Sequence, residues 1–355
     1  MSATGLPGLL TTLQHHGVFD AVRMAGLEHC APPPWWLAVL QGIAAWIASL
    51  LIISSFFAPL MLLGEGPLVR GVGGVVLVGG AVWLFARDSL FTGQMGLAFS
   101  LAGQALLVSV VFDGFDAFAT RPRVIAAVGL AIAVGMLVPA STVLHRTVCA
   151  LLALGYGAVL VGPGDALAIY ALVLTAAAAA CWLLRRAWAA SPRAALIKAL
   201  AHALTLAALV AGWIVAVDPS FGALLSPGTS TATLPTAAFV YPLGAGIVLL
   251  ATIAWLVRGL PPAQAAAGIG AGAIYALTAW NAPGLAVSGA LLLAVFHACH
   301  RPWIALTLLA AIVYLGRFYY SLEATLLVKS GALAATGLVL LGLQFGLRRW
   351  RRTRP

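Results

Sequence analysis

Long runs of apolar residues alternate with short polar segments along most of the chain, from Trp36 to Leu347. A helix needs roughly 20 apolar residues to cross a hydrocarbon core about 30 Å thick. Only helices and closed barrels satisfy their own backbone polar groups in lipid. The pattern therefore predicts an all-α fold, a polytopic transmembrane helix bundle.

We place twelve predicted spans at residues 36–63, 69–86, 91–112, 123–140, 143–162, 165–184, 194–217, 236–257, 263–280, 283–299, 302–317 and 323–347. The pairs of spans that meet near Pro139, Pro283 and Pro302 are short. A run of fewer than about 18 apolar residues is marginal for crossing the bilayer, so these pairs can also be re-entrant or strongly tilted. Ten spans is therefore the alternative.

The sequence divides into three parts and predicts no soluble domain. Residues 1–35 form a cytoplasmic amphipathic segment, because apolar residues between Leu13 and Leu27 fall near one helical face. This segment lacks the features of a signal peptide, and we expect it to be retained. Residues 36–347 form the transmembrane bundle, and residues 348–355 form a basic cytoplasmic tail.

Composition supports a lipid environment. Hydrophobic residues make up 63% of the chain and charged residues only 8%, and the mean hydropathy is +1.06. This leaves too little polar surface to coat a soluble globule. The net charge is +10, but five of the basic residues lie in the last eight positions, directly after a predicted span. Such a cluster binds anionic lipid, so the expected partner is the lipid bilayer and not nucleic acid.

The distribution of charge predicts the orientation of the chain. If both termini are cytoplasmic, most of the 19 Lys and Arg residues fall on the inner side, as the positive-inside rule requires. Only five basic residues then face outward, namely Arg70, Arg121, Arg123, Arg317 and Lys329.

A first candidate polar site lies on the third predicted span. Asp113 and Asp116 are three residues apart and share a helical face near its outer end, while Gln94 and Gln104 lie deeper in the span. Two close carboxylates can bind a cation or share a proton. The alternative is that both aspartates cap the outer boundary, where they are solvated or paired with Arg121 and Arg123, which costs little free energy.

A second candidate polar site begins at the outer end of the eleventh predicted span. It contains Arg317, Tyr319, Tyr320, Glu323 and Lys329. Lys329 follows Glu323 by six residues, about 9 Å along a helix, and the two do not share a face. We therefore expect Lys329 to pair with another helix, where an aspartate of the first site is one choice, or to extend toward the interface. The alternative is an ordinary aromatic belt with flanking charges.

Other polar and small residues have simpler explanations. Gly268 and Gly272 are spaced four apart, which is typical of close packing between helices. His297 and His300 have a spacing compatible with metal ligands, but no nearby carboxylate completes a site, so we interpret them as interfacial histidines. His202 follows Lys198 by one helical turn and can titrate. We expect no cofactor, metal or disulfide.

Two segments resemble a known family. The run FYYSLEATLLVKSGAL at 318–333 is similar to the C-terminal signature of a bacterial integral-membrane family that is defined only as a domain of unknown function, and GQMGLAFSLAGQALL at 93–107 fits the same family. The resemblance implies a multi-pass protein of the bacterial cytoplasmic (inner) membrane. It also implies a membrane-anchored partner carrying a GDYXXLXY motif, since such proteins tend to be encoded beside members of the family. The matching polar positions are Tyr319, Tyr320, Glu323 and Lys329, with Gln94 and Gln104 behind them.

Three classes of function follow. The first is a membrane subunit that works with an extracytoplasmic or membrane-anchored partner, and we rank it first because of the resemblance. The second is an ion-coupled secondary transporter of a small solute, in which Asp113, Asp116, Glu323 and Lys329 couple solute and ion movement. The third is a lipid-modifying enzyme. An enzyme is disfavoured because such chemistry needs a concentrated set of polar groups.

Overall fold

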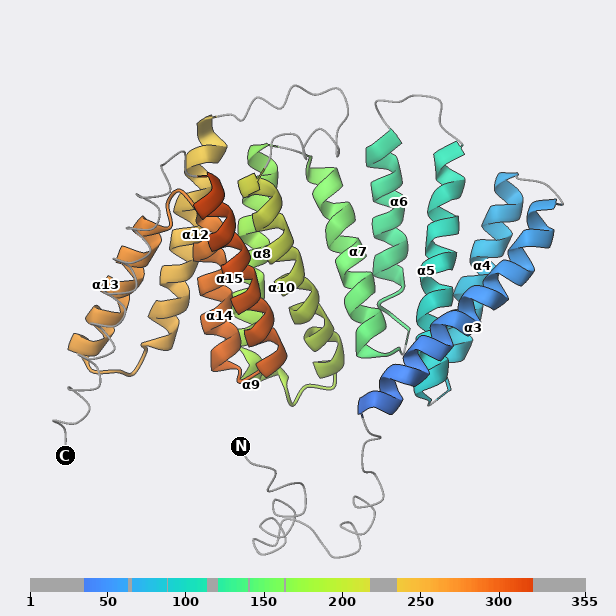
Figure 1. Ribbon diagram of the computed structural model, residues 1–355, viewed down its shortest axis with the longest axis horizontal. Helices are drawn as coiled ribbons and strands as arrows, with labels where there is room; N and C mark the ends of the chain where they lie inside the picture. Colours follow the sequence, from blue (N-terminus) through green and yellow to red (C-terminus); the bar gives the residue numbers. More distant parts are fainter. Residues whose placement is uncertain are drawn as a thin grey trace, which may run out of the picture. The chain divides into compact units, whose positions relative to one another are not determined.

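The computed structural model describes residues 35–62, 66–87, 89–113, 121–139, 141–162, 164–217 and 235–321. These residues form helices joined by short turns, with no β-strand among them (Figure 1). The chain divides into two compact units, Met1–Leu107 and Val108–Pro355. The predicted amphipathic segment, the twelfth span and the basic tail lie outside the described residues.

The first unit contains α3 (Trp35–Leu62), α4 (Pro67–Phe85) and most of α5 (Leu90–Asp113). Glycines bring α4 and α5 close together. A Cβ added at Gly74 would lie 2.8 Å from Leu107, and one added at Gly103 would lie 2.8 Å from Val78. Small residues permit such close approach between helices in lipid.

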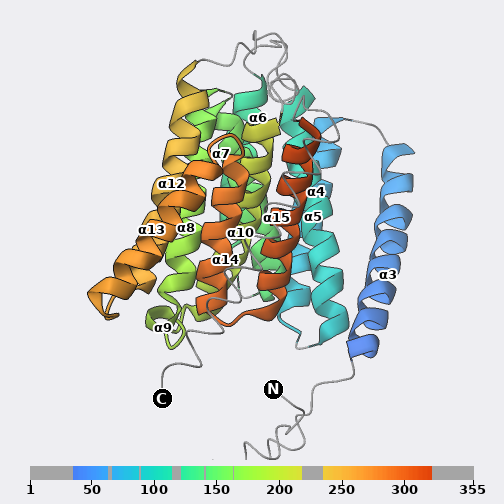
Figure 2. The same cartoon turned by 60° about the vertical axis from the view of Figure 1, so that its left-hand side comes forward.

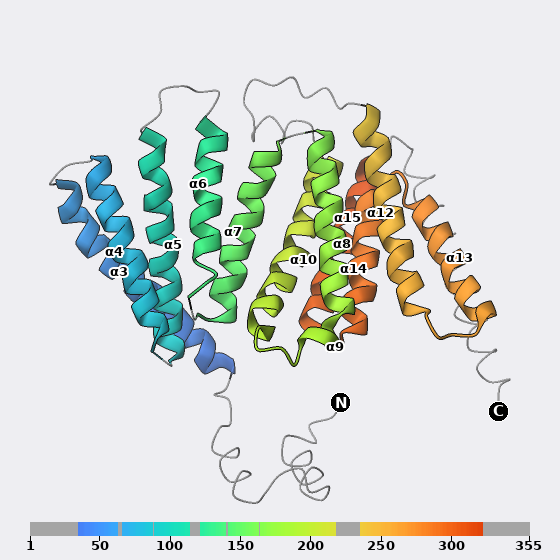
Figure 3. The ribbon, with the colours of Figure 1, turned by 180° about the vertical axis from the view of Figure 1, so that it is seen from behind.

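The second unit contains α6 (Arg121–Gly135), α7 (Val143–Val161), α8 (Asp165–Leu183), α9 (Arg185–Trp188), α10 (Ala194–Val217), α12 (Pro235–Leu256), α13 (Pro262–Thr278), α14 (Pro283–His297) and α15 (Arg301–Ser321). Helix α14 contacts α8, α10, α12 and α15. Seen from behind, α8 lies between α10 and α12 (Figure 3). Helix α13 packs against α12 at the edge of the unit (Figures 1 and 2).

Alanine and a few large side chains form the core of this unit. Trp182, Tyr241, Leu249 and Leu291 are almost fully buried and are surrounded by buried alanines from α8, α10, α12 and α14. The alanines allow the helices to approach one another, and the large side chains fill the remaining space. The core therefore consists of small residues packed around a few large ones.

Local sequence sets the helix ends. The Thr142 side chain accepts a hydrogen bond from the His145 backbone at 3.2 Å and caps α7. Prolines occupy the first turns of α4, α13 and α14, where a missing N–H costs nothing. Gly162 and Gly164, with φ of 81° and 91°, turn the chain between α7 and α8, because glycine adopts positive φ without steric cost.

Every predicted span from 36–63 to 302–317 coincides with a helix to within a few residues. Seven helices of the described part are long and apolar enough to cross a membrane: α4, α5, α7, α8, α10, α12 and α15. This confirms an all-helical fold with the properties of a membrane protein. The count of twelve spans and the cytoplasmic termini stay predictions.

Candidate functional site

The first predicted polar site lies on α5. Gln104 is buried, and its side-chain amide donates a hydrogen bond to Ser100 Oγ, one turn earlier on the same helix, at 2.9 Å. Gln94 is partly buried. Asp113 is the last residue of α5, but its side chain and all of Asp116 lie outside the described residues. The predicted pairing of the two aspartates stays a prediction.

The second predicted polar site begins in the last turns of α15. The Arg317 guanidinium carbon lies 5.8 Å from the centre of the Trp213 ring on α10, within the range of a cation–π contact. Tyr319 is partly buried, and the side chain of Tyr320 is not described. Glu323 and Lys329 lie outside the described residues. Contact between the side chains of the two predicted sites therefore stays a prediction.

A different cluster of rings lies at the other end of α15. It consists of Trp182 from α8, His202 from α10, His300 from the turn between α14 and α15, and Trp303 from α15, and we call it the tryptophan–histidine cluster. The His202 ring centre lies 4.9 Å from Trp303, 5.6 Å from His300 and 5.8 Å from Trp182. The His300 ring meets Trp182 edge-on at 5.4 Å. Three helices and the turn before α15 thus bring these four rings together.

Hydrogen bonds and backbone conformation fix two members of this cluster. The Trp182 indole donates to Thr205 Oγ1 at 2.8 Å, and that hydroxyl donates to the Ala201 carbonyl at 2.7 Å. Cys299 has a φ of 54°, the only positive φ at a non-glycine residue in the described chain. This left-handed turn ends α14 and places His300 at the start of α15, where its carbonyl accepts bonds from the first helical amides.

Positive charge surrounds the cluster. The Arg185 guanidinium donates to the Ala298 carbonyl, and Lys198 precedes His202 by one helical turn. Burial, followed by the charges of Arg185 and Lys198, lowers the pKa of His300. Among the described side chains of this unit the only acid is Asp165, at the opposite end of α8. The cluster therefore carries positive charge that no described carboxylate offsets.

Two ring nitrogens of the cluster are shielded from water without a hydrogen bond. They are His202 Nε2 and His300 Nδ1. A buried polar atom without a partner costs free energy, and in a native protein it indicates an unoccupied partner or a functional role. This is the strongest sign of a binding site among the described residues.

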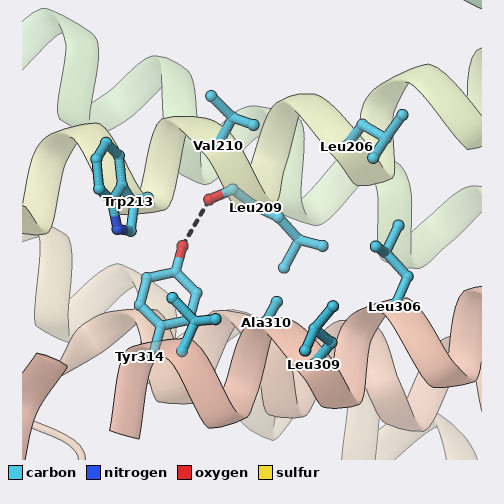
Figure 4. Close-up of a pocket in the computed structure, with 9 residues that line it drawn as sticks. Leu206, Leu209, Val210, Trp213, Leu306, Leu309, Ala310 and Tyr314 are labelled. Atoms are coloured by element: carbon cyan, nitrogen blue, oxygen red, sulfur yellow. Dashed lines mark hydrogen bonds between the residues drawn. The ribbon is translucent and has the colours of Figure 1, made fainter. Parts of the chain in front are cut away.

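An apolar groove runs between α10 and α15 (Figure 4). Its floor contains the buried Leu209 and Tyr314, and the Tyr314 hydroxyl donates to the Leu209 carbonyl at 2.5 Å. Its rims carry exposed side chains, including Val210, Leu309 and Val313. The groove has a volume of about 270 Å³ and presents almost no polar atom.

Sequence reasoning missed the tryptophan–histidine cluster. We interpreted His297 and His300 as interfacial histidines. In the structure His297 is exposed, but His300 packs against His202 from another helix. The available signal was weak: His202 and His300 each lie near a Lys or Arg at the same predicted side of the membrane. Nothing in the pattern of one helix indicated that they meet.

The lengths and apolar composition of seven described helices are those of a multi-pass α-helical membrane protein. The chain belongs to the family described as a domain of unknown function, DUF4401, whose model matches residues 34–350. This confirms the resemblance to a family of unknown function. No curated protein and no solved structure matches the chain.

Proposed function

We propose that this protein is a membrane subunit that works with a membrane-anchored partner, whose transmembrane helix packs on the outer face of α13. The partner class follows from the family resemblance, which implies a protein with a GDYXXLXY motif. The observation that supports the proposal is the surface of α13 itself.

Helix α13 presents small residues on both sides. On its inner side, a Cβ added at Gly268 would lie 3.2 Å from Val257, the residue after α12, and one added at Gly272 would overlap Ile253 on α12. On its outer side, Ala266 and Gly270 are spaced four apart and exposed, and a Cβ added at Gly270 would meet no atom within 4 Å. The inner side packs against α12, and the outer side carries residues that are equally small.

Small residues spaced four apart let a second helix approach closely and gain van der Waals contact, which is the main source of helix association in lipid. Helix α13 also has only 17 residues, fewer than the roughly 20 that span a bilayer comfortably. For a short helix with an alanine and glycine face, van der Waals contact with a second helix is more favourable than contact with lipid tails.

Co-purification of tagged protein with a co-expressed GDYXXLXY-type membrane protein tests the proposal. Gly270→Leu should reduce the amount of partner recovered at least about tenfold, because a large side chain separates the two helices. Gly79→Leu on α4 is the matched control, since a Cβ there also meets nothing within 4 Å, and it should leave recovery unchanged. Equal recovery with Gly270→Leu and wild type would show that α13 is not the docking face.

A further inference from the structure

The tryptophan–histidine cluster and the apolar groove follow one another along α10 and α15. Helices α10 and α15 run in the same direction, with Leu206 beside Leu306 and Trp213 beside Tyr314 (Figure 4). His202 precedes Leu206 by one turn, and Trp303 precedes Leu306 by about one turn. The groove therefore starts where the cluster ends and extends toward Trp213, about 16 Å from His202 at 1.5 Å per residue.

The two ends of this surface have different chemistry. The cluster end carries Arg185, Lys198 and two imidazoles with unpartnered nitrogens. A phosphate accepts charge-assisted hydrogen bonds from cationic side chains and from imidazole N–H groups. Tryptophans are also enriched at the boundary between headgroups and hydrocarbon. The groove end offers hydrocarbon contacts, since its one hydroxyl, on Tyr314, is already bonded to Leu209.

We propose that an anionic phospholipid binds here, with its phosphate at the tryptophan–histidine cluster and one acyl chain in the groove between α10 and α15. Charge complementarity selects an anionic headgroup, because Lys198 and Arg185 face no described carboxylate. The volume of the groove favours a single acyl chain, since about 270 Å³ is far less than a helix with a diameter of about 10 Å would occupy along the same length. The site is independent of the face of α13.

Native mass spectrometry of the purified full chain tests the headgroup. The probes are phosphatidylglycerol, which is anionic, and phosphatidylcholine, which is zwitterionic. Wild type should retain phosphatidylglycerol preferentially, and Lys198→Gln should reduce that retention about fivefold, since each basic residue near an anionic headgroup contributes on the order of 1 kcal/mol. Lys198 is exposed, so its replacement should leave the fold intact.

A basic residue of similar surroundings supplies the control. The Arg258 guanidinium lies 4.2 Å from the Trp255 ring centre but is not part of the cluster. Arg258→Gln should leave phosphatidylglycerol retention at the wild-type level. Equal loss with Lys198→Gln and Arg258→Gln would show only general attraction between basic residues and anionic lipid, and would overturn the proposal.

A second pair of variants tests the groove and separates the sources of phosphate. Ala310→Trp fills the groove and should abolish retention of phosphatidylglycerol, whereas Ile312→Trp, on an exposed part of α15 outside the groove, should not. Binding of inorganic phosphate is measured by titration at constant ionic strength. If phosphate binds as tightly as the lipid and Ala310→Trp has no effect, the site takes a soluble anion and the lipid proposal is wrong.

Discussion

Gly284 shows how a single residue controls packing in the second unit. It lies at the start of α14, and an added Cβ would overlap the ring of Tyr314 on α15. Tyr314 is buried and bonded to Leu209, so it cannot move without losing that hydrogen bond. We expect Gly284→Ala to lower the free energy of unfolding by about 1–3 kcal/mol, as overpacking does elsewhere. Thermal unfolding of the purified protein in detergent measures this change.

Gly270→Ala is the control for this prediction. A Cβ at Gly270 meets no atom within 4 Å, so the substitution should be neutral or should stabilise the helix by up to about 1 kcal/mol through higher helix propensity. If both variants lose stability equally, Tyr314 is not held in place and the packing argument fails.

His300 makes stability depend on pH. Burial and the charges of Arg185 and Lys198 lower its pKa in the folded protein, so the unfolded chain binds the proton more tightly. The stability that neutral His300 contributes is present above about pH 6.5, the unperturbed histidine pKa, and is lost as the pH falls toward the lowered value. In lipid-free zwitterionic detergent, the unfolding temperature should therefore decrease between about pH 7.5 and 5.

Replacement of the histidines tests the assignment. His300→Gln should flatten this part of the pH profile, whereas His297→Gln, at an exposed position, should leave it unchanged. A profile that is the same in His300→Gln and wild type would assign the pH dependence to other groups.

For single residues, the sequence indicated which side chains are polar but not which of them contact one another. Gln104, Arg317 and His300 were each recognisable as unusual in an apolar chain. The neighbours of Arg317 and His300, which are Trp213 and His202, come from another helix, about 100 residues away in sequence. Periodicity along one helix carries no information about such contacts, because it specifies a face and not the helix that packs on it.

Among the helices, α14 is short but central. It has 15 residues, and the sequence predicted a span here, with a tilted or re-entrant segment as the alternative. In the structure Val287, Ala290 and Leu291 are fully buried, and α14 contacts five other helices, α8, α10, α12, α13 and α15. Hydropathy predicted the helix and its length, but uniform hydrophobicity could not distinguish a helix surrounded by protein from one surrounded by lipid.

This position of α14 leads to a prediction for its core face. Ala290→Leu should destabilise the protein by about 1–3 kcal/mol, because the added carbons have no space between α14 and its neighbours. Ala251→Leu, at an exposed position of α12, should change stability by no more than about 0.5 kcal/mol. Chemical denaturation in mixed micelles compares the two, and a small effect at Ala290 would contradict the central placement of α14.

Helix α9 is a short element that the hydropathy pattern does not predict. Its four residues, Arg185–Trp188, lie between the predicted spans 165–184 and 194–217, and they form a single helical turn. The Trp188 indole donates to the Cys181 carbonyl at 2.7 Å and satisfies one of the free carbonyls at the end of α8. A capping interaction of this kind depends on one side chain, so hydropathy averaged over a span does not detect it.

For the molecule as a whole, the predicted orientation assigns every turn of the second unit to one side of the membrane. The turns that contain Arg258 and Cys299 should be cytoplasmic, and the turn at Asn281 should face outward, since the predicted spans alternate in direction and the inner turns carry the basic residues. Cys299 and Asn281 lie at the two ends of α14, and both are exposed. A cysteine at either position therefore reports on one side of the membrane each.

Labelling with a membrane-impermeant maleimide checks this orientation in intact spheroplasts. The variants retain one cysteine each: Cys299 alone after replacement of Cys30, Cys149 and Cys181, or Asn281→Cys without native cysteines. Asn281→Cys should react in intact cells, and Cys299 should react only after the membrane is permeabilised. The reverse pattern would place the basic turns outside, contrary to the positive-inside rule. It would also place the phosphate of the proposed lipid in the opposite leaflet, because the tryptophan–histidine cluster includes His300, the neighbour of Cys299.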